Sequence, residues 1–266
     1  MIDPFGRNIT YLRVSVTDRC NLRCDYCKPP EGVKLLRHED ILSFEEIVDV
    51  VRIAVEMGVT KVRITGGEPV VRRNVESLIV MLSAIDGIED LAMTTNGTLL
   101  ADHAPALAAA GLHRVNVSLD AMDPASYARI TRGGDVRTAL AGIDAAIAAG
   151  LTPVKLNCVI LASSDEPDAR AVADFAREKH IQVRFIPRMD FQAGRFSIVQ
   201  GGTGGDCPRC NRLRLSSDGF VRPCLFSDLG FSVRQLGAAG ALTRAVGQKP
   251  HSGRACTHNW MHGIGG

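Results

Sequence analysis

The stretch Lys61-Val62-Arg63-Ile64-Thr65-Gly66-Gly67-Glu68-Pro69 runs from a short β-rich segment straight into a polar, glycine-containing turn. Five similar β-rich segments occur along the chain, at residues 11–17, 90–95, 114–119, 154–160 and 182–186. Segments with helical periodicity lie between them, after the Ser43/Glu46 capping box and at residues 74–85, 101–110, 136–149 and 167–179. Strands that alternate with helices favour a parallel sheet. Six such units predict an α/β fold, a partial (β/α)6 barrel that falls short of the eight units of a closed TIM barrel.

Polar residues follow four of these β-rich segments at the point where each segment ends. They are residues 65–69, residues 94–97, Ser118 with Asp120, and Asn157. In parallel α/β folds the functional site lies at the C-terminal ends of the strands. The four strand ends therefore predict one concave site.

Three cysteines, Cys20, Cys24 and Cys27, lie within eight residues. Three thiolates this close can hold three irons of a [4Fe–4S] cluster and leave the fourth iron without a protein ligand. A cluster that only transfers electrons normally has four cysteine ligands, so an open iron suggests chemistry at the metal. The alternatives are a zinc site or buried core cysteines, but zinc spacings usually come as two separate pairs.

A second group consists of Cys207, Cys210 and Cys224. Residues 211–216 and 220–224 predict a hairpin that returns Cys224 to the other two cysteines. This group fits either a second cluster with an open iron or a zinc site, and the first group favours the cluster. The fourth zinc ligand would be His251, Cys256 or His258. The remaining cysteine, Cys158, lies in a β-rich segment and is expected in the core.

Composition limits the setting of the protein. The chain has 266 residues and a net charge of +2, which gives no reason to expect a nucleic-acid or membrane partner. No apolar run is long enough to span a bilayer. Six of the eight cysteines lie in the two groups, which favours metal binding in a reducing cytoplasm. We expect a barrel at residues 1–190 and a small extension at residues 191–266.

Cationic residues occur where buried strands are usually apolar. Alternation along a strand places Arg212 and Arg214 on one face. Four further cations, Arg13, Arg63, Lys155 and Arg184, fall in other β-rich segments. Taken singly, each of these four has an alternative explanation, which is that its long side chain extends to solvent at the rim of the barrel. As a set they predict a site for a phosphorylated substrate, because arginine makes bidentate contacts to phosphate oxygens.

The Cys20–Cys27 motif, with Tyr26 before its last cysteine, and Gly66-Gly67-Glu68-Pro69 together resemble the signature of radical S-adenosylmethionine (SAM) enzymes. The resemblance extends over nearly the whole chain to the GTP 3′,8-cyclases of molybdenum cofactor biosynthesis. It is carried by residues 11–20, 62–69, 115–120, 130–134, 154–157, 183–186, 211–215 and 264–266.

The resemblance implies roles for individual residues. Cys20, Cys24 and Cys27 would hold the cluster that binds SAM, and Cys207, Cys210 and Cys224 an auxiliary [4Fe–4S] cluster whose open iron binds guanine. The residues implied for SAM are Tyr26, Gly66, Gly67, Glu68, Ser118, Asn157 and Met189. Those implied for GTP are Arg13, Arg63, Thr94, Lys155, Arg212 and Arg214. The tail residues Gly265 and Gly266 would reach the active site and act in catalysis with Arg212 and Arg214.

The implied reaction begins with one-electron reduction of SAM to methionine and a 5′-deoxyadenosyl radical. That radical takes the hydrogen from C3′ of GTP, and the C3′ radical attacks C8 of guanine. The implied partners are GTP, an electron donor such as flavodoxin or ferredoxin, and a second copy of the chain in a homodimer.

The chain also departs from the family pattern. Pro187 stands where the family has Glu, it lies only twenty positions before Cys207, and this stretch contains the glycine-rich run Gly201-Gly202-Thr203-Gly204-Gly205. The loop at residues 162–166 lacks the usual Asn-Asp pair, and Cys256 is an additional cysteine that is either a bystander or a fourth cluster ligand. These departures leave a second hypothesis, that the protein is a paralogue that acts on another nucleotide or a peptide. A non-catalytic iron–sulfur or zinc protein would leave the Gly-Gly-Glu-Pro turn unexplained.

Overall fold

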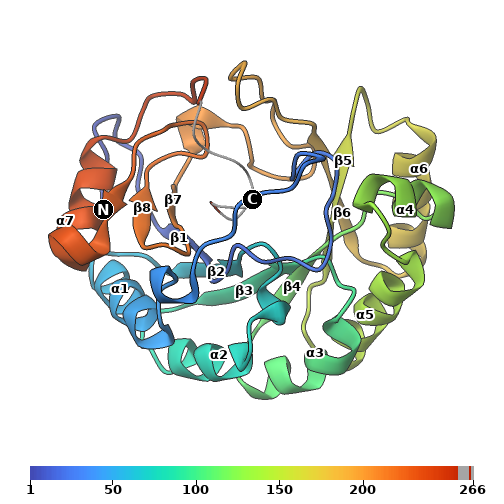
Figure 1. Cartoon of the computed structure of the whole chain (residues 1–266), viewed down its shortest axis with the longest axis horizontal. Coiled ribbons are helices and arrows are strands. Elements are labelled where there is room, and N and C mark those ends of the chain that lie inside the picture. The colour runs from blue at the N-terminus through green and yellow to red at the C-terminus, as the bar shows by residue number, and fades with distance from the viewer. Residues whose placement is uncertain (257–263, 265–266) are drawn as a thin grey trace.

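The computed structural model describes residues 1–256 and 264, and its strands form one sheet of nine. The strand order is β6-β5-β4-β3-β2-β1-β7-β8-β9. Strands β6 to β7 in this order are parallel, whereas β7–β8 and β8–β9 pair antiparallel. In Figure 1 the parallel strands form a curved inner wall and the helices lie outside it. The predicted partial barrel is therefore confirmed.

All six β-rich segments form strands, with ends within two residues of those expected. The strands are β1 (Tyr11–Ser15), β2 (Lys61–Thr65), β3 (Asp90–Thr95), β4 (Arg114–Ser118), β5 (Lys155–Ile160), β6 (Gln182–Pro187), β7 (Arg212–Leu215), β8 (Phe220–Arg222) and β9 (Phe231–Ser232). The helices are α1 (Phe44–Glu56), α2 (Val75–Ser83), α3 (Leu100–Ala109), α4 (Pro124–Thr131), α5 (Val136–Ala148), α6 (Pro167–Glu178) and α7 (Val233–Gly247). Short 3₁₀ helices occur at His38–Asp40, Pro69–Val71 and Cys207–Arg209.

Helix α1 begins where its capping box predicts. The Ser43 hydroxyl accepts a hydrogen bond from the Glu46 N–H at 3.1 Å, and the Glu46 carboxylate accepts one from the Ser43 N–H at 2.7 Å. Helices α4 and α7 were not expected from the sequence. Asp123 caps α4 and Pro124 occupies its first turn, so a start signal was present, but the helix is only eight residues long.

The two faces of the barrel strands differ in chemistry because successive side chains of a strand point to opposite faces. Leu12, Val62 and Leu213 are fully or almost fully buried in the hydrophobic core. Their strand neighbours Arg13 and Arg63 are paired in register on the other face. The barrel interior is therefore lined with polar side chains, while the apolar face packs against the helices.

Strand β7 extends the barrel sheet on its β1 side. The register pairs Tyr11 with Arg212 and Arg13 with Arg214. The predicted hairpin is confirmed, because β8 runs antiparallel to β7. Helix α7 follows it and packs against α1, which Figure 1 shows beside it. Among the described residues, no helix has the length and apolar character needed to cross a membrane.

Candidate active site

The first cysteine group lies on a tight loop after β1. The Cys24 carbonyl accepts hydrogen bonds from the N–H groups of Cys27 and Lys28, both at 3.0 Å. The Asp25 N–H donates to the Ile130 carbonyl at 3.0 Å, which fixes the loop to α4. Burial raises the pKa of Cys20, Cys24 and Cys27, and for Cys27 to about 11. The three thiols also interact electrostatically with one another, so they form one group of soft donors that suits iron.

The Gly-Gly-Glu turn after β2 is held against the residues that precede Cys20. The Gly67 N–H donates to the Thr17 carbonyl at 2.7 Å, and the Glu68 N–H donates to the Arg19 carbonyl at 2.8 Å. A Cβ on Gly67 would lie 2.1 Å from the Arg19 carbonyl oxygen. Only glycine allows this approach, so the turn and the cysteine loop are built as one unit.

Glu68 connects this unit to the end of β3. Its carboxylate accepts hydrogen bonds from the Thr95 hydroxyl and the Asn96 N–H, both at 2.7 Å. The Asn96 side chain in turn donates to the Cys20 sulfur at 3.8 Å. Glu68 is almost completely buried, and burial raises its pKa to about 7 even though these hydrogen bonds lower it. The ends of β2 and β3 thus converge on the first cysteine group.

The end of β4 makes a second connection to the cysteine loop. The Tyr26 hydroxyl donates to Asp120 Oδ2 at 2.7 Å, and the Val159 N–H donates to Asp120 Oδ1 at 2.7 Å. Burial raises the pKa of Asp120 to about 6. The ends of β2, β3 and β4 thus all connect to the first cysteine group, whereas Asn157 of β5 lines the cavity described below.

The second cysteine group lies at the β7–β8 hairpin. Cys207 begins a 3₁₀ turn in which its carbonyl accepts from the Cys210 N–H at 3.1 Å. Cys224 follows β8, and all three cysteines line one cavity. Burial would raise the pKa of Cys210, but the Lys249 ammonium and groups of Arg212 lower it below its usual value. This favours the thiolate form that binds metal.

The zinc alternative for the second cysteine group needs a fourth ligand from His251, Cys256 or His258. In residues 1–256 and 264, no three His, Cys, Asp or Glu side chains converge so as to hold one metal ion. A structural zinc site needs four ligands around one ion, whereas the cysteines of a cubane bind separate irons. The His251 ring instead packs edge-on against Phe5, with 5.1 Å between ring centroids. His258 lies outside the described residues.

The cavity that the second cysteine group lines has a volume of about 370 Å³ and a strongly cationic wall. Eight of its residues are cations, namely Arg13, Lys61, Arg63, Arg114, Arg184, Arg212, Arg214 and Lys249. Its two acidic residues are each paired with an arginine, Asp90 with Arg114 at 2.6 Å and Asp206 with Arg209 at 2.5 Å. The excess positive charge suits a polyanionic ligand.

The cations are held close together at low dielectric. Burial, and to a smaller extent neighbouring arginines, lower the pKa of both Arg13 and Arg63 to about 10. The Tyr11 ring lies 5.6 Å from the guanidinium carbon of Arg63 and 5.6 Å from that of Arg212. In the described part of the chain, buried Nε atoms of Arg63 and Arg184 have no hydrogen-bond partner. These donors fit a ligand rich in acceptor oxygens.

The structure distributes the predicted site residues over two regions. Those in the cavity wall are Arg13, Arg63, Asn157, Met189, Arg212, Arg214, Cys207, Cys210 and Cys224. Those on the cysteine loop, or at strand ends on the same side of the barrel, are Cys20, Cys24, Cys27, Tyr26, Gly66, Gly67, Glu68 and Ser118. Thr94 and Lys155 do not line the cavity but both lie opposite Asn116 in the sheet register. Gly265 and Gly266 lie outside the described residues.

Sequence reasoning missed several residues of the cavity wall, and strand alternation could have found them. Lys61 and Arg114 are the first residues of β2 and β4, two positions before Arg63 and Asn116 on the same face. Arg184 was noted as a strand cation but was not assigned to GTP. Arg209, which stands between Cys207 and Cys210 in the sequence, has a mostly exposed side chain and does not line the cavity.

The segment between β6 and β7, residues 188–206, closes one side of the cavity. Phe196, Val199 and Thr203 from this segment belong to the cavity wall. The Thr203 hydroxyl accepts a hydrogen bond from Arg212 Nη2 at 2.6 Å. Cys256 is buried against the same segment, where its N–H donates to the Phe191 carbonyl at 2.9 Å, and it is not part of the cavity wall.

Known proteins share both the sequence and the fold of this chain. The family model of the radical SAM superfamily matches residues 14–176. A GTP 3',8-cyclase of Petrotoga mobilis is 41% identical over 88% of this chain and 86% of its own length. That of Geobacter sulfurreducens is 39% identical over 96% of this chain and 95% of its own. The latter alignment spans 313 positions against 266 residues here, so that relative has residues this chain lacks.

Solved structures support the fold. The enzyme anSMEcpe, with bound AdoMet and a peptide, superposes with a TM-score of 0.62 at 15% identity, over 91% of this chain and 81% of that one. Streptococcus suis SuiB bound to its precursor peptide SuiA superposes with a TM-score of 0.58 at 18% identity, over 70% of this chain and 41% of that one. Together with the sequence relatives, these similarities identify the chain as a member of the GTP 3′,8-cyclase family of radical SAM enzymes.

Proposed function

We propose that the protein is a GTP 3′,8-cyclase, which converts GTP to (8S)-3′,8-cyclo-7,8-dihydroguanosine 5′-triphosphate in molybdenum cofactor biosynthesis. The observation that carries the proposal is the cavity whose wall combines eight cations with three cysteines. A nucleoside triphosphate has a polyanionic part for the cations. Its base offers nitrogen and oxygen atoms that can bind a metal held by the cysteines.

The first cysteine group would hold the cluster that binds SAM. As a radical SAM family member, the chain uses a [4Fe–4S] cluster and SAM, which together supply a 5′-deoxyadenosyl radical when one electron is delivered. Cys20, Cys24 and Cys27 are its proposed ligands. Gly67 and Glu68 join the ligand loop to β2, and the contacts of Tyr26 join it to β4. These contacts hold the site rigid, which a reactive radical requires.

Residues of the barrel interior would bind the triphosphate. Arg13 and Arg63 project side by side from β1 and β2, and Arg214 lies opposite Arg13 on β7. Their guanidinium groups can make bidentate contacts to phosphate oxygens, and these contacts are strong because the site is buried. We assign Thr94 and Lys155, which lie on the same face of the sheet, to GTP as well. The role of Arg212 and Arg214 is to orient the nucleotide and neutralise its charge.

The second cysteine group would hold an auxiliary [4Fe–4S] cluster whose open iron binds guanine. Its support is the donor set of three partly buried cysteines, with Lys249 favouring the Cys210 thiolate. We assign Ser118, Asn157, Met189 and Gly66 to SAM, and Gly265 and Gly266 to the reacting end of the site. An electron donor such as flavodoxin or ferredoxin, a homodimer and a cytoplasmic location also remain part of the proposal.

The decisive test is anaerobic incubation of the iron-loaded protein with SAM, a reductant and GTP. We expect both 5′-deoxyadenosine and the cyclised nucleotide. Formation of 5′-deoxyadenosine without the cyclised product would contradict GTP as substrate. Absence of both, with iron and sulfide present, would contradict the proposed radical chemistry.

A paralogue that acts on another nucleotide or a peptide is the second candidate. It is favoured by the short segment 188–206, which forms part of the cavity wall and holds Arg212 through Thr203. The same assay with ATP, CTP and UTP in place of GTP distinguishes it. The GTP-specific reading predicts that GTP alone yields a cyclised product.

A further inference from the structure

Lys249 is a buried cation that the reaction outlined above does not use. It follows helix α7, and only 3% of its surface is exposed. Its ammonium donates to the Arg212 carbonyl at 2.7 Å and to the Pro223 carbonyl at 2.6 Å. Its charge also interacts electrostatically with the Cys210 and Cys224 side chains. The two carbonyls occupy two of the three N–H donors of the lysine.

The acceptors of Lys249 lie next to two proposed cluster ligands. Arg212 is two residues after Cys210, and Pro223 directly precedes Cys224. One ammonium therefore connects the two strands of the β7–β8 hairpin at the places where the cysteines leave them. Burying a lysine costs folding free energy unless its charge is paired. The arrangement therefore depends on the carbonyls and thiols around the ammonium, and it places one positive charge beside the thiols.

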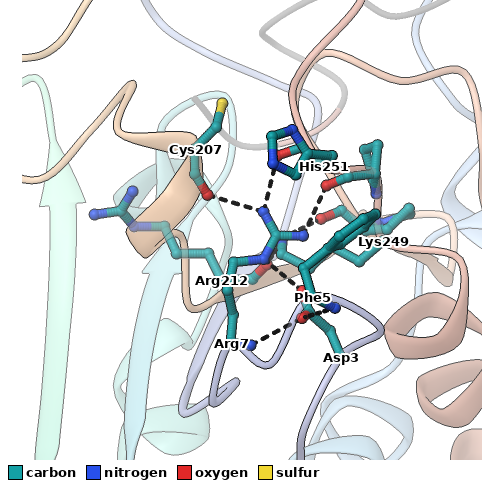
Figure 2. A network of polar contacts seen from close by, with 9 residues as sticks. Asp3, Phe5, Arg7, Cys207, Arg212, Lys249 and His251 are labelled. Atoms are coloured by element: carbon teal, nitrogen blue, oxygen red, sulfur yellow. Dashed lines mark hydrogen bonds and ion pairs between the residues drawn. The ribbon is translucent and has the colours of Figure 1, made fainter.

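Arg7 extends this bracing to the third cysteine. Its guanidinium donates to the Cys207 carbonyl at 2.8 Å and to the Pro250 carbonyl at 2.7 Å. The Asp3 carboxylate fixes Arg7 from the other side, through a contact to Arg7 Nε at 2.5 Å. Figure 2 shows Arg7 between Asp3 and the backbone of Cys207, with Lys249 close by. Residues 3–7 and 249–251 thus form a bracket behind all three cysteines.

We propose that Lys249 is a positioning residue of the auxiliary centre, which holds Cys210 and Cys224 in place and compensates the negative charge of the thiolates. The inference rests on the proposed function, because it takes the second cysteine group to be cluster ligands. Net charge and hydrogen bonds to the sulfurs set the reduction potential of an iron–sulfur cluster. A fixed positive charge beside the cluster ligands makes the cluster easier to reduce.

The test uses the full chain with Cys20, Cys24 and Cys27 replaced by Ala, so that all remaining cluster signal comes from the auxiliary centre. In this parent protein we compare Lys249→Gln, which keeps hydrogen-bond donors but removes the charge, with Lys249→Arg, which keeps the charge. Lys179→Gln is the matched control, because Lys179 ends helix α6 and pairs with Asp144 instead. Iron content and the reduction potential are measured anaerobically, and thermal unfolding checks the fold.

We expect the parent to bind about four irons per chain. Lys249→Gln should lower the reduction potential or lose iron, while Lys249→Arg and Lys179→Gln retain the parent values. Unchanged iron and potential in a folded Lys249→Gln protein would overturn the role of Lys249 and leave the proposed function intact. A parent that binds no cluster would refute the auxiliary centre, and the role of Lys249 with it. If Lys249→Gln does not fold, Lys249→Met, which also removes the charge, takes its place. A lower potential or lost iron in Lys249→Met supports the role, and parent values in a folded Lys249→Met protein contradict it.

Discussion

Single residues decide whether the first cysteine group can form. Gly67 is required because the turn passes so close to the Arg19 carbonyl that no side chain fits. Glu68 stays buried between the ends of two strands because three hydrogen bonds from Thr95, Asn96 and Val70 satisfy its carboxylate. The sequence predicted that both residues matter, but only through a family motif. The physical reasons depend on distant neighbours, Arg19 for Gly67 and Thr95 with Asn96 for Glu68, which no local pattern reveals.

Replacement of Gly67 by Ala should separate the turn from the cysteine loop. The added Cβ overlaps the Arg19 carbonyl, and overpacking of this kind costs about 1–3 kcal/mol. We expect a lower unfolding free energy and loss of SAM cleavage, measured by chemical denaturation and by 5′-deoxyadenosine formation. Gly247→Ala is the control, because a Cβ there meets no atom within 4 Å. Full SAM cleavage by Gly67→Ala would contradict the close packing.

Replacement of Glu68 by Gln should change how stability depends on pH. The folded protein raises the pKa of Glu68 from 4.5 to about 7, so its contribution to stability is fully present below pH 4.5 and is lost as pH rises to 7. The unfolding free energy of Glu68→Gln should therefore rise relative to the original protein by about 3 kcal/mol over this window. Denaturant unfolding at several pH values measures the difference. A difference in unfolding free energy that does not change with pH would show that folding does not raise the pKa of Glu68.

At the scale of the strand, alternation explains most of the substrate cavity. Once β1, β2 and β7 are known to lie side by side, Arg13, Arg63 and Arg214 must share one face. Periodicity predicted these strands and the cationic set, but not the pairing of β7 with β1, because the two segments are about 200 residues apart. Helix α7 was missed for a different reason. Its sequence contains several glycines, and Gly237 has a non-helical backbone conformation.

Arg63→Met tests the strand face. Removing one of several buried like charges should raise thermal stability without ligand, while GTP binding weakens by about 1.5–3 kcal/mol because a charged hydrogen bond is lost. Thermal unfolding and calorimetric titration with GTP measure the two effects. Arg52→Met serves as control, since Arg52 is an exposed residue of helix α1 paired with Asp49. Equal GTP affinity in both variants would exclude Arg63 as a phosphate ligand.

At the scale of the whole molecule, the barrel encloses two chemically distinct regions. The strand ends carry the first cysteine group, while the interior and the β7–β8 hairpin carry the cations and the second group. The sequence predicted both cysteine groups, a polar site at the strand ends and a cationic set for a phosphorylated substrate, but not how these parts lie relative to one another. In the structure the cavity extends into the barrel, because cations at the third position of β1 and at the first and third positions of β2 and β7 line it.

The cationic interior should make polyphosphates stabilise the entire fold. A ligand that binds only the folded state raises the unfolding free energy by about 2.7 kcal/mol at a hundred times its dissociation constant. We expect GTP and inorganic triphosphate to raise the melting temperature and guanosine to raise it less. Added salt should reduce the effect of the two anions, since screening weakens charge pairing. Equal stabilisation by guanosine and GTP would mean that the cavity makes no favourable contact with the phosphates.

The pairing of β1 with β7 also has a consequence for synthesis of the chain. Residues 11–15 are synthesised about 200 residues before the strand that covers their outer edge, which ends at Leu215. Contacts between such distant segments form slowly, and an uncovered strand edge can pair with other chains. One edge of the nascent barrel therefore stays uncovered until β7 has been synthesised. Chains released before residue 215 should aggregate, and cluster insertion at the hairpin can follow only after Cys224 has been added.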